Sequence, residues 1–133
     1  MGRRLILDTN VLISYERCTI DRLMFHEDEL AIVALTVAEF RVGIEMAGTA
    51  ARAAERSRAL TAILDNVEVL EYTEATAAHH AALIACTKRS GTPRGKHDLI
   101  IAAHAAQTGR TVVSRDAKAR FGDLPGVLAT GVE

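Results

Sequence analysis

Strand-length apolar runs alternate with longer helical patterns along this chain, and that alternation restricts the possible folds most strongly. Four apolar runs, 4–7, 30–35, 67–70 and 111–114, have the length of buried strands, and 127–129 is a candidate fifth. Strands that alternate with helices form parallel sheets with right-handed crossovers. The sequence therefore predicts an α/β fold, a three-layer α/β/α sandwich around a mostly parallel sheet of four to five strands.

The helical segments are expected from apolar residues at a spacing near 3.6. They are 9–15, 20–25, 36–47, 50–64, 75–89 and 98–107. Thr36 is expected to cap the third of these, because Thr36 and Glu39 match the capping-box pattern and place Glu39 in the first turn. The helix from Asp98 to Gln107 is apolar nearly all round and rich in alanine, which predicts a central, tightly packed helix.

Length and composition predict a single domain over residues 1–133. Hydrophobic residues make up 49% of the chain and charged residues 25%, which is typical of globular proteins rather than disordered ones. The longest stretches without Asp, Glu, Lys or Arg, 75–87 and 99–109, are too short to span a membrane. Two cysteines are too few for a disulfide framework or a cysteine-based zinc site. We therefore expect a cytoplasmic protein without a membrane segment.

Four acidic residues are candidates for one site; three of them come after strands, whereas Asp98 follows a helix and a loop, so its place depends on the helix returning to the same edge. Asp8 follows the first strand, Glu39 lies in the helix after the second, Asp98 opens the alanine-rich helix and Asp116 follows the fourth strand. In open parallel sheets, ligands bind beyond the carboxyl ends of the strands. Clustered carboxylates repel one another unless a cation neutralises them, and oxygen ligands suit Mg²⁺ or Mn²⁺ rather than zinc. The alternative for each acid alone is a helix cap.

The motifs around these acids resemble those of the PIN-domain nucleases. The resemblance lies in 7–10, 36–43, 97–105 and 111–116, followed by Leu124 to Val127, in order over almost the whole chain. Chain length and motif details are most similar to the VapC toxins of bacterial type II toxin–antitoxin pairs. The resemblance implies a PIN-like fold and a Mg²⁺-dependent endoribonuclease for which Mn²⁺ can substitute. It also implies a homodimer that a VapB-type antitoxin holds inactive.

The same resemblance makes Asp8, Glu39, Asp98 and Asp116 the acidic quartet that binds the metal and carries catalysis. Asp123 is an alternative ligand for which a surface role is favoured. In the expected mechanism, Mg²⁺ activates a water that attacks phosphorus in line and leaves 5′-phosphate and 3′-hydroxyl ends. Asn10 and Ser114 are expected to orient carboxylates or water.

A basic segment surrounds the last two acids. From Cys86 to Arg120 there are eight Lys and Arg residues and two acids, in a chain whose formal net charge is −1. This distribution predicts a basic rim that contacts RNA phosphates around an acidic pocket. Arg115 is the first candidate for an RNA contact, followed by Lys96 and Lys118.

Two other functions stay open on the sequence. The same quartet would serve a DNA-cleaving or structure-specific PIN-like nuclease, and substrate competition separates the two because only RNA carries the 2′-hydroxyl. The chain could instead be a non-catalytic RNA or protein interaction module whose acids are only helix caps. The absence of a tight Mn²⁺ site would favour this module.

Overall fold

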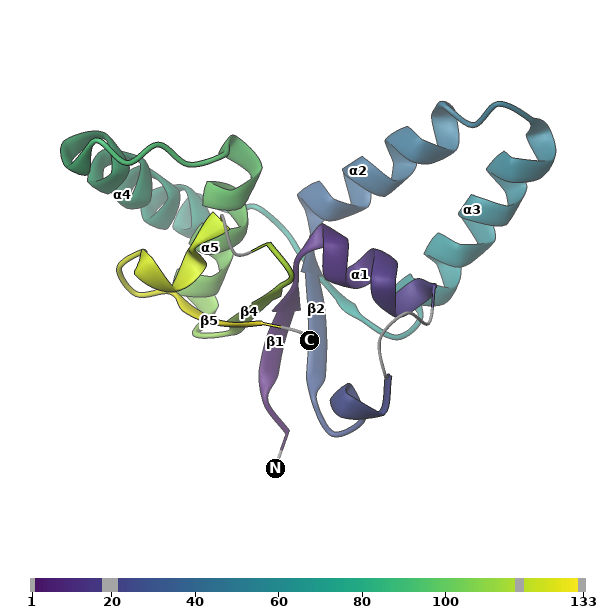
Figure 1. The fold of residues 1–133 in the computed structure, drawn as a ribbon, viewed down its shortest axis with the longest axis horizontal. Helices are drawn as coiled ribbons and strands as arrows, with labels where there is room; N and C mark the ends of the chain where they lie inside the picture. Colours follow the sequence, from purple (N-terminus) through teal and green to yellow (C-terminus); the bar gives the residue numbers. More distant parts are fainter. Residues whose placement is uncertain (1, 18–21, 117–118, 132–133) are drawn as a thin grey trace.

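The computed structural model describes residues 2–17, 22–116 and 119–131 and places five strands in one sheet (Figure 1). The strands are β1 (Arg4–Leu7), β2 (Glu29–Val33), β3 (Glu68–Leu70), β4 (Thr111–Ser114) and β5 (Leu128–Gly131). Their order is β3-β2-β1-β4-β5, and neighbouring strands pair in parallel. The predicted parallel sheet is therefore confirmed.

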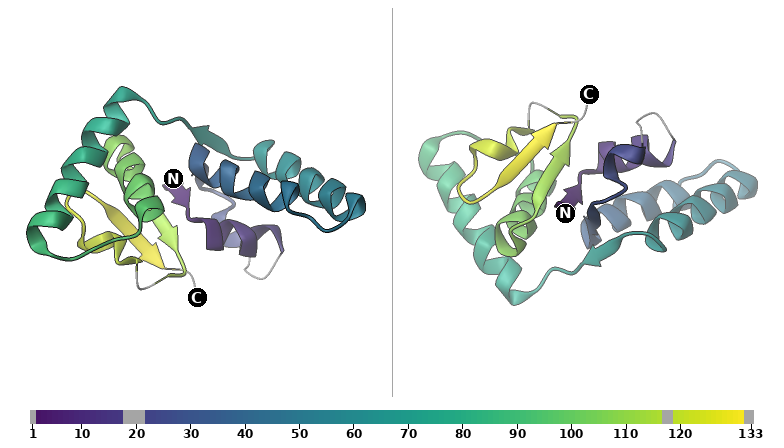
Figure 2. Two further views of the ribbon diagram at one scale, coloured as in Figure 1. Left: turned by 90° about the horizontal axis from the view of Figure 1, so that it is seen from above. Right: turned by 90° about the horizontal axis from the view of Figure 1, so that it is seen from below.

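Helices cover both faces of this sheet (Figure 2). They are α1 (Thr9–Glu16), α2 (Ala34–Glu45), α3 (Ala50–Leu64), α4 (Glu74–Ser90) and α5 (Lys96–Thr108), with 3₁₀ turns at Arg22–Phe25 and Phe121–Asp123. In the described part of the chain, no helix is long and apolar enough to cross a membrane. The three-layer arrangement predicted from the alternation is confirmed.

Two hydrophobic clusters, one on each face, hold the layers together. Successive residues of a strand point to opposite faces. Leu5 and Leu7 of β1 accordingly pack with α1 and α3, whereas Ile6 packs with α5. Val112 and Val113 of β4 divide between the same two clusters. The sheet is thus buried on both sides, as the continuous apolar runs predict.

The most deeply buried helix is α5, as its composition predicts. Leu99 and the five residues from Ile101 to Ala105 are buried against the sheet and α4. The helix ends at Gly109, which has a left-handed φ of 72°. Because α5 is fixed along most of its length, the acidic residue in its first turn has a rigid base.

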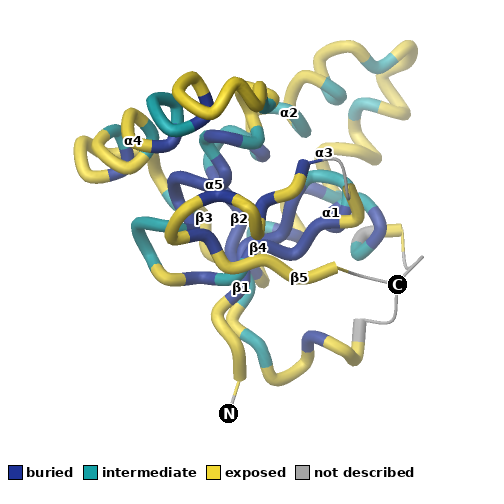
Figure 3. Tube along the Cα trace, turned by 60° about the vertical axis from the view of Figure 1, so that its left-hand side comes forward, coloured by how far each residue is buried: buried dark blue, intermediate teal, exposed yellow. Residues whose placement is uncertain are grey.

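By contrast, the hairpin of α2 and α3 projects beyond the sheet (Figures 1 and 3). In α2 only Thr36 is fully buried, and in α3 only Leu60 and Ile63. Val42 and Met46, near the far end of α2, are 60% and 77% exposed. The hairpin is therefore anchored at its sheet end and surrounded by solvent at its far end.

The transition from β2 to α2 differs from the prediction. The strand ends at Val33, which is also the N-cap residue of α2, so Thr36 already lies in the first helical turn. The predicted capping box is therefore wrong, and the Thr36 hydroxyl is buried without a hydrogen-bond partner among the described atoms. Glu39 accordingly lies in the second turn of α2 rather than the first. The last residue of β2 that pairs with β3 is Val33, opposite Leu70, so the strand ends before the apolar run does.

Other boundaries shift by one or two residues. The helix α5 begins at Lys96 with Gly95 as its N-cap, so Asp98 lies inside the first turn instead of opening the helix. The strand β5 covers 128–131 rather than 127–129. The predicted short helix over 20–25 is described only from Arg22 onward, where it is a 3₁₀ turn. Such end effects are expected, since hydrogen bonding decides boundaries that periodicity only approximates.

The buried His104 on α5 generates a prediction for stability against pH. Burial, and secondarily the charge of His80, lowers the pKa of His104. The folded state therefore favours the neutral ring, so stability is full above the ordinary histidine pKa of about 6.5 and falls as pH drops below it. We expect His104→Gln to flatten this decline between about pH 7 and 5. Urea unfolding at several pH values measures the free energy of unfolding of each variant. The exposed His79→Gln is the control. The prediction is contradicted if the free energy of unfolding of His104→Gln declines with falling pH as steeply as that of the wild type.

Candidate active site

The candidate site lies where the strand order changes direction, between β1 and β4. The chain builds β2 and β3 on one side of β1 and β4 and β5 on the other. The ladder pairs Leu7 with Val113, and the amide of Asp8 continues it with a 3.0 Å hydrogen bond to the Val113 carbonyl. This junction brings Asp8 beside Ser114, although they are 106 residues apart. Such a crevice at the carboxyl ends of strands is where open α/β sheets bind ligands.

Asp8 is held rigidly at this junction. It is 7% exposed and is the N-cap of α1, where its Oδ1 accepts a 2.8 Å hydrogen bond from the Thr9 amide. Its Oδ2 accepts a hydrogen bond of the same length from the Ser114 hydroxyl. Asp8 is therefore a helix cap, as the alternative interpretation predicts. The cap uses one carboxylate oxygen and fixes the direction of the other.

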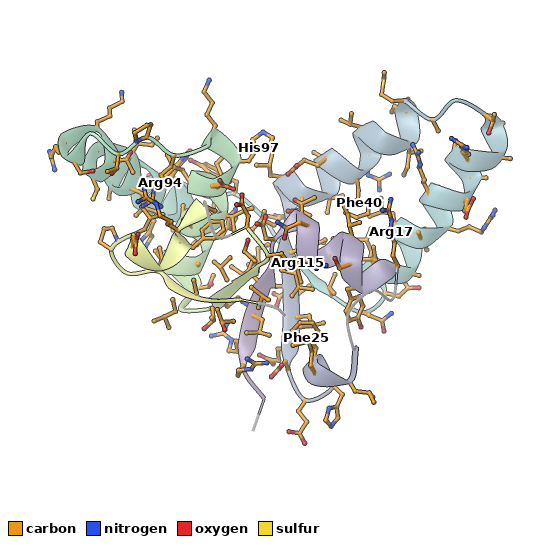
Figure 4. All side chains as sticks on the ribbon, in the orientation of Figure 1. Arg17, Phe25, Phe40, Arg94, His97 and Arg115 are labelled. Carbon is orange, nitrogen blue, oxygen red and sulfur yellow. The ribbon has the colours of Figure 1, made fainter. Side chains whose placement is uncertain are left out.

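Glu39 reaches the same region from α2. Its Oε1 accepts a 3.3 Å hydrogen bond from the Thr9 hydroxyl and lies 3.5 Å from Nδ1 of His97. Figure 4 shows His97 at the start of α5, on the side that faces α2. Glu39 is therefore tied both to α1 and to the helix that carries Asp98. Neither tie follows from the sequence spacing.

Asp98 shows that the four acids share one region. Burial raises the pKa of Asp98, and the charges of Asp8, Asp116 and Glu39 raise it further, against a lowering by His97. Asp98 thus lies within electrostatic reach of acids from three other segments. Gly95 leaves room for it, since a Cβ on Gly95 would stand 3.1 Å from Asp98 Oδ2.

Asp116 follows β4 in an exposed position, and its backbone is fixed by two contacts. Its amide donates to the Ser114 hydroxyl over 3.0 Å, so one serine touches both Asp8 and the segment carrying Asp116. The adjacent amide of Arg115 donates to Asn10 Oδ1 over 3.3 Å. Ser114 therefore contacts a predicted ligand directly, whereas Asn10 contacts the backbone one residue before Asp116.

The donor set at this crevice suits a hard divalent cation in its chemistry. The converging groups are carboxylates, and burial together with the charges of the neighbouring acids raises the pKa of Asp98. As the side chains are placed, no three His, Cys, Asp or Glu residues in the described ranges stand close enough together to hold an ion directly. Binding would therefore require these carboxylates to draw together, with the cation offsetting their repulsion.

A groove of about 570 Å³ adjoins the acids, between α1 and the α2–α3 hairpin. We call it the α1–α3 groove. Its walls include the apolar Ile13 and Phe40 and the acidic Glu39. Arg17, Arg52 and Arg56 also line it, together with the acidic Glu55. Figure 4 labels Arg17 and Phe40, two of the residues that line this groove. These cations come from the first half of the chain, outside the basic segment identified in the sequence.

The residues predicted to contact RNA take different positions. The exposed Arg115 donates from its guanidinium to the Ser14 hydroxyl over 2.7 Å, beside the acids. Lys96 lines a separate cavity between α4 and α5. Lys118 lies outside the described residues.

Two other residues of the second half were also candidates: Arg110, one of the eight basic residues counted in the predicted rim, and Asp123, the alternative metal ligand. Arg110 is buried and bound to Glu68 over 2.7 Å, which excludes it from a phosphate-binding rim. The reason is its place at the opposite end of β4 from the acids. Asp123 is exposed, 4.0 Å from Arg120.

Comparison with known proteins gives a consistent picture. The model of the PIN domain family matches residues 5–125. A Salmonella typhimurium protein named tRNA(fMet)-specific endonuclease VapC is 30% identical over 129 residues, covering 93% of this chain and 94% of that protein.

Two solved structures extend the comparison. One is VapBC-5 of Mycobacterium tuberculosis, a member of the VapBC family of toxin–antitoxin systems. It has a TM-score of 0.76 at 28% identity, over 99% of each chain. The other is VapBC2 of Rickettsia felis bound to a promoter DNA fragment. It has a TM-score of 0.85 at 20% identity, over 98% of this chain and 99% of that one, and this likeness concerns the fold alone.

Gly43 in the wall of the groove generates a prediction for stability. A Cβ at this helical position would meet nothing within 4 Å. Because glycine costs helix stability relative to alanine, we expect Gly43→Ala to raise the free energy of unfolding by about 0.5–1 kcal/mol. Urea unfolding measures it. A destabilised variant would show that the groove has no room for the added methyl group.

Proposed function

The chain belongs to the VapC group of the PIN-domain family, and from that premise we propose that it is a metal-dependent endoribonuclease, the toxin of a type II toxin–antitoxin pair. The observation that carries the proposal is the convergence of acids from α2, α5 and the ends of β1 and β4 on one crevice. Carboxylates gathered in this way are a recurrent arrangement for cleaving phosphodiesters with a divalent cation.

Asp8, Glu39, Asp98 and Asp116 are the proposed ligands of a Mg²⁺ ion that Mn²⁺ can replace. Such an ion supplies Lewis-acid chemistry, making water more acidic and offsetting the negative charge that develops on the phosphodiester. Within the chain, Ser114 fixes one oxygen of Asp8, and Thr9 and His97 hold Glu39. Because these contacts already restrict the two carboxylates, less side-chain conformational entropy is lost when an ion binds. The hydroxyls of Ser114 and Thr9 and the ring of His97 also place polar groups around Asp8 and Glu39.

RNA is the proposed substrate, with tRNA the first to test because the Salmonella relative is named for it. The α1–α3 groove supports a strand substrate. It is lined by Glu39 and by Arg17, Arg52 and Arg56, whose charges suit phosphates. Arg115, beside the acids, is the proposed contact closest to the cleaved bond. Lys96, at the separate cavity between α4 and α5, is a further proposed RNA contact.

The partner and assembly follow from the family as proposals. VapBC-5 of Mycobacterium tuberculosis, to which the chain is similar, is described as a member of the VapBC family of toxin–antitoxin systems. We propose that a VapB-type antitoxin binds this chain and inhibits it, that the chain acts as a homodimer, and that it acts on RNA in the cytoplasm. A DNA-cleaving nuclease with the same acids is the second candidate, and substrate competition distinguishes the two.

Cleavage of total RNA by the purified chain tests the proposal. We expect fragments with Mg²⁺ or Mn²⁺ and none with EDTA, while DNA stays intact. Asp98→Asn should lower the rate more than about 100-fold, since losing contacts behind metal ligands already costs 10–100-fold. Asp65→Asn, an exposed acid at the end of α3, is the matched control. Cleavage that survives both EDTA and Asp98→Asn would refute the acidic site, and absence of cleavage by folded, metal-loaded protein would favour the interaction module.

Ser114→Ala tests the orienting contact at the junction. The hydroxyl touches Asp8 and the amide of Asp116, so its loss frees two of the proposed ligands at once. We expect Mn²⁺ affinity to fall by about 10-fold or more. Electron paramagnetic resonance titration measures free Mn²⁺, and the exposed Ser57→Ala serves as control. Wild-type affinity in Ser114→Ala would assign the serine to folding alone.

A further inference from the structure

Arg94 forms a cross-brace between two segments that approach the acidic site. It lies in the loop between α4 and α5, directly before the N-cap Gly95. One terminal nitrogen, Nη1, donates to the carbonyl of Ala119 over 2.8 Å and to that of Arg120 over 2.9 Å (Figure 4). The guanidinium thus joins the start of α5 to the segment that follows Asp116.

The contact is made in a partly desolvated place. Arg94 is half-buried, and its Nε is buried without a hydrogen-bond partner among the described atoms. A desolvated guanidinium is expensive unless its position is fixed by strong contacts. An exposed tether between loops would not need this burial. The two hydrogen bonds of Arg94 therefore form a rigid link of fixed length between the start of α5 and the segment at Ala119 and Arg120.

The segment held by Arg94 has an unusual backbone. Arg120 has a left-handed φ of 45°, the one positive φ at a described residue other than glycine. Such a conformation persists when its surroundings determine it. Arg94 provides contacts that hold this conformation, since its guanidinium donates to the carbonyls of Arg120 and of Ala119.

Both ends of the brace lead to proposed ligands within a few bonds. On one side, the Ala119 amide donates to the carbonyl of Asp116 over 3.2 Å. On the other, Gly95 accepts from the amide of Leu99 over 3.1 Å and lies against the carboxylate of Asp98. The arginine thus connects the backbone of Asp116 to the first turn that carries Asp98.

We propose that Arg94 is a positioning residue that fixes the spacing of the two backbone segments carrying Asp98 and Asp116, and that this spacing sets the affinity of the acidic site for a divalent cation when the carboxylate side chains turn toward the ion. This inference rests on the proposed function, because it assigns a role toward the same cation. Arg94 does not contact the substrate or the ion. A purely structural arginine would change the stability of the fold and leave the affinity of the folded protein unchanged.

Mn²⁺ titration of folded protein, followed by electron paramagnetic resonance well below the unfolding temperature, tests the proposal. We expect Arg94→Met to weaken Mn²⁺ affinity by about 10-fold, the range typical for residues behind metal ligands. Arg94→Lys, which keeps a donor and a charge, should lie between Met and wild type. The matched control is Arg89→Met, an exposed arginine at the end of α4, for which we expect wild-type affinity.

The outcomes separate this inference from the proposed function. If the wild type binds Mn²⁺, Asp98→Asn does not, and Arg94→Met binds as the wild type does, Arg94 has no positioning role although the metal site stands. If Arg94→Met does not fold, Arg94→Gln, whose amide is too short to reach both carbonyls, replaces it, and wild-type affinity in that variant again overturns the inference. If the wild type binds no Mn²⁺, both the metal site and the role of Arg94 are refuted.

Discussion

The parallel ladder between β1 and β4 is the contact on which the candidate site depends. Among the described strands it is the one pairing that joins the first half of the chain to the last third, and its register sets Leu7 against Val113. From this register follow the amide contact of Asp8 and the hydrogen bond from Ser114. A slip of one residue would turn the strand side chains to the opposite faces, so packing on both faces specifies the register strongly.

Much of the architecture was predictable, because burial on both faces leaves a strong signal. The strands at 4–7 and 111–114 and the helix at 50–64 have the predicted bounds. Continuous apolar runs and 3.6-residue spacing record which surfaces must leave water. The transition at Val33 was mispredicted for the same reason. Strand and helix are both apolar there, so hydropathy cannot mark the boundary that pairing with β3 determines.

Strand ends in a parallel sheet converge by topology, and this is why the sequence predicts that Asp8, Glu39 and Asp116 lie close together. The contacts behind them could not be found in this way. The bond from Thr9 to Glu39 and the approach of His97 link three helices whose relative placement the sequence does not state. The bonds of Arg94 to two carbonyls depend on the left-handed backbone at Arg120. The count of basic residues also included Arg110 in the predicted RNA-contacting rim, although Arg110 is paired with Glu68. A count along the sequence does not show which end of a strand a residue occupies.

The four acids rest on supports of unequal stiffness. Asp8 and Asp98 extend from elements buried in the core, whereas Glu39 belongs to a hairpin with few buried side chains. Segments with little buried surface open at lower free energy than core elements. The bond from Thr9 and the approach of His97 are therefore what couples Glu39 to the other acids. The same hairpin forms a wall of the α1–α3 groove, so its movement would change the access of a substrate and the position of Glu39 together.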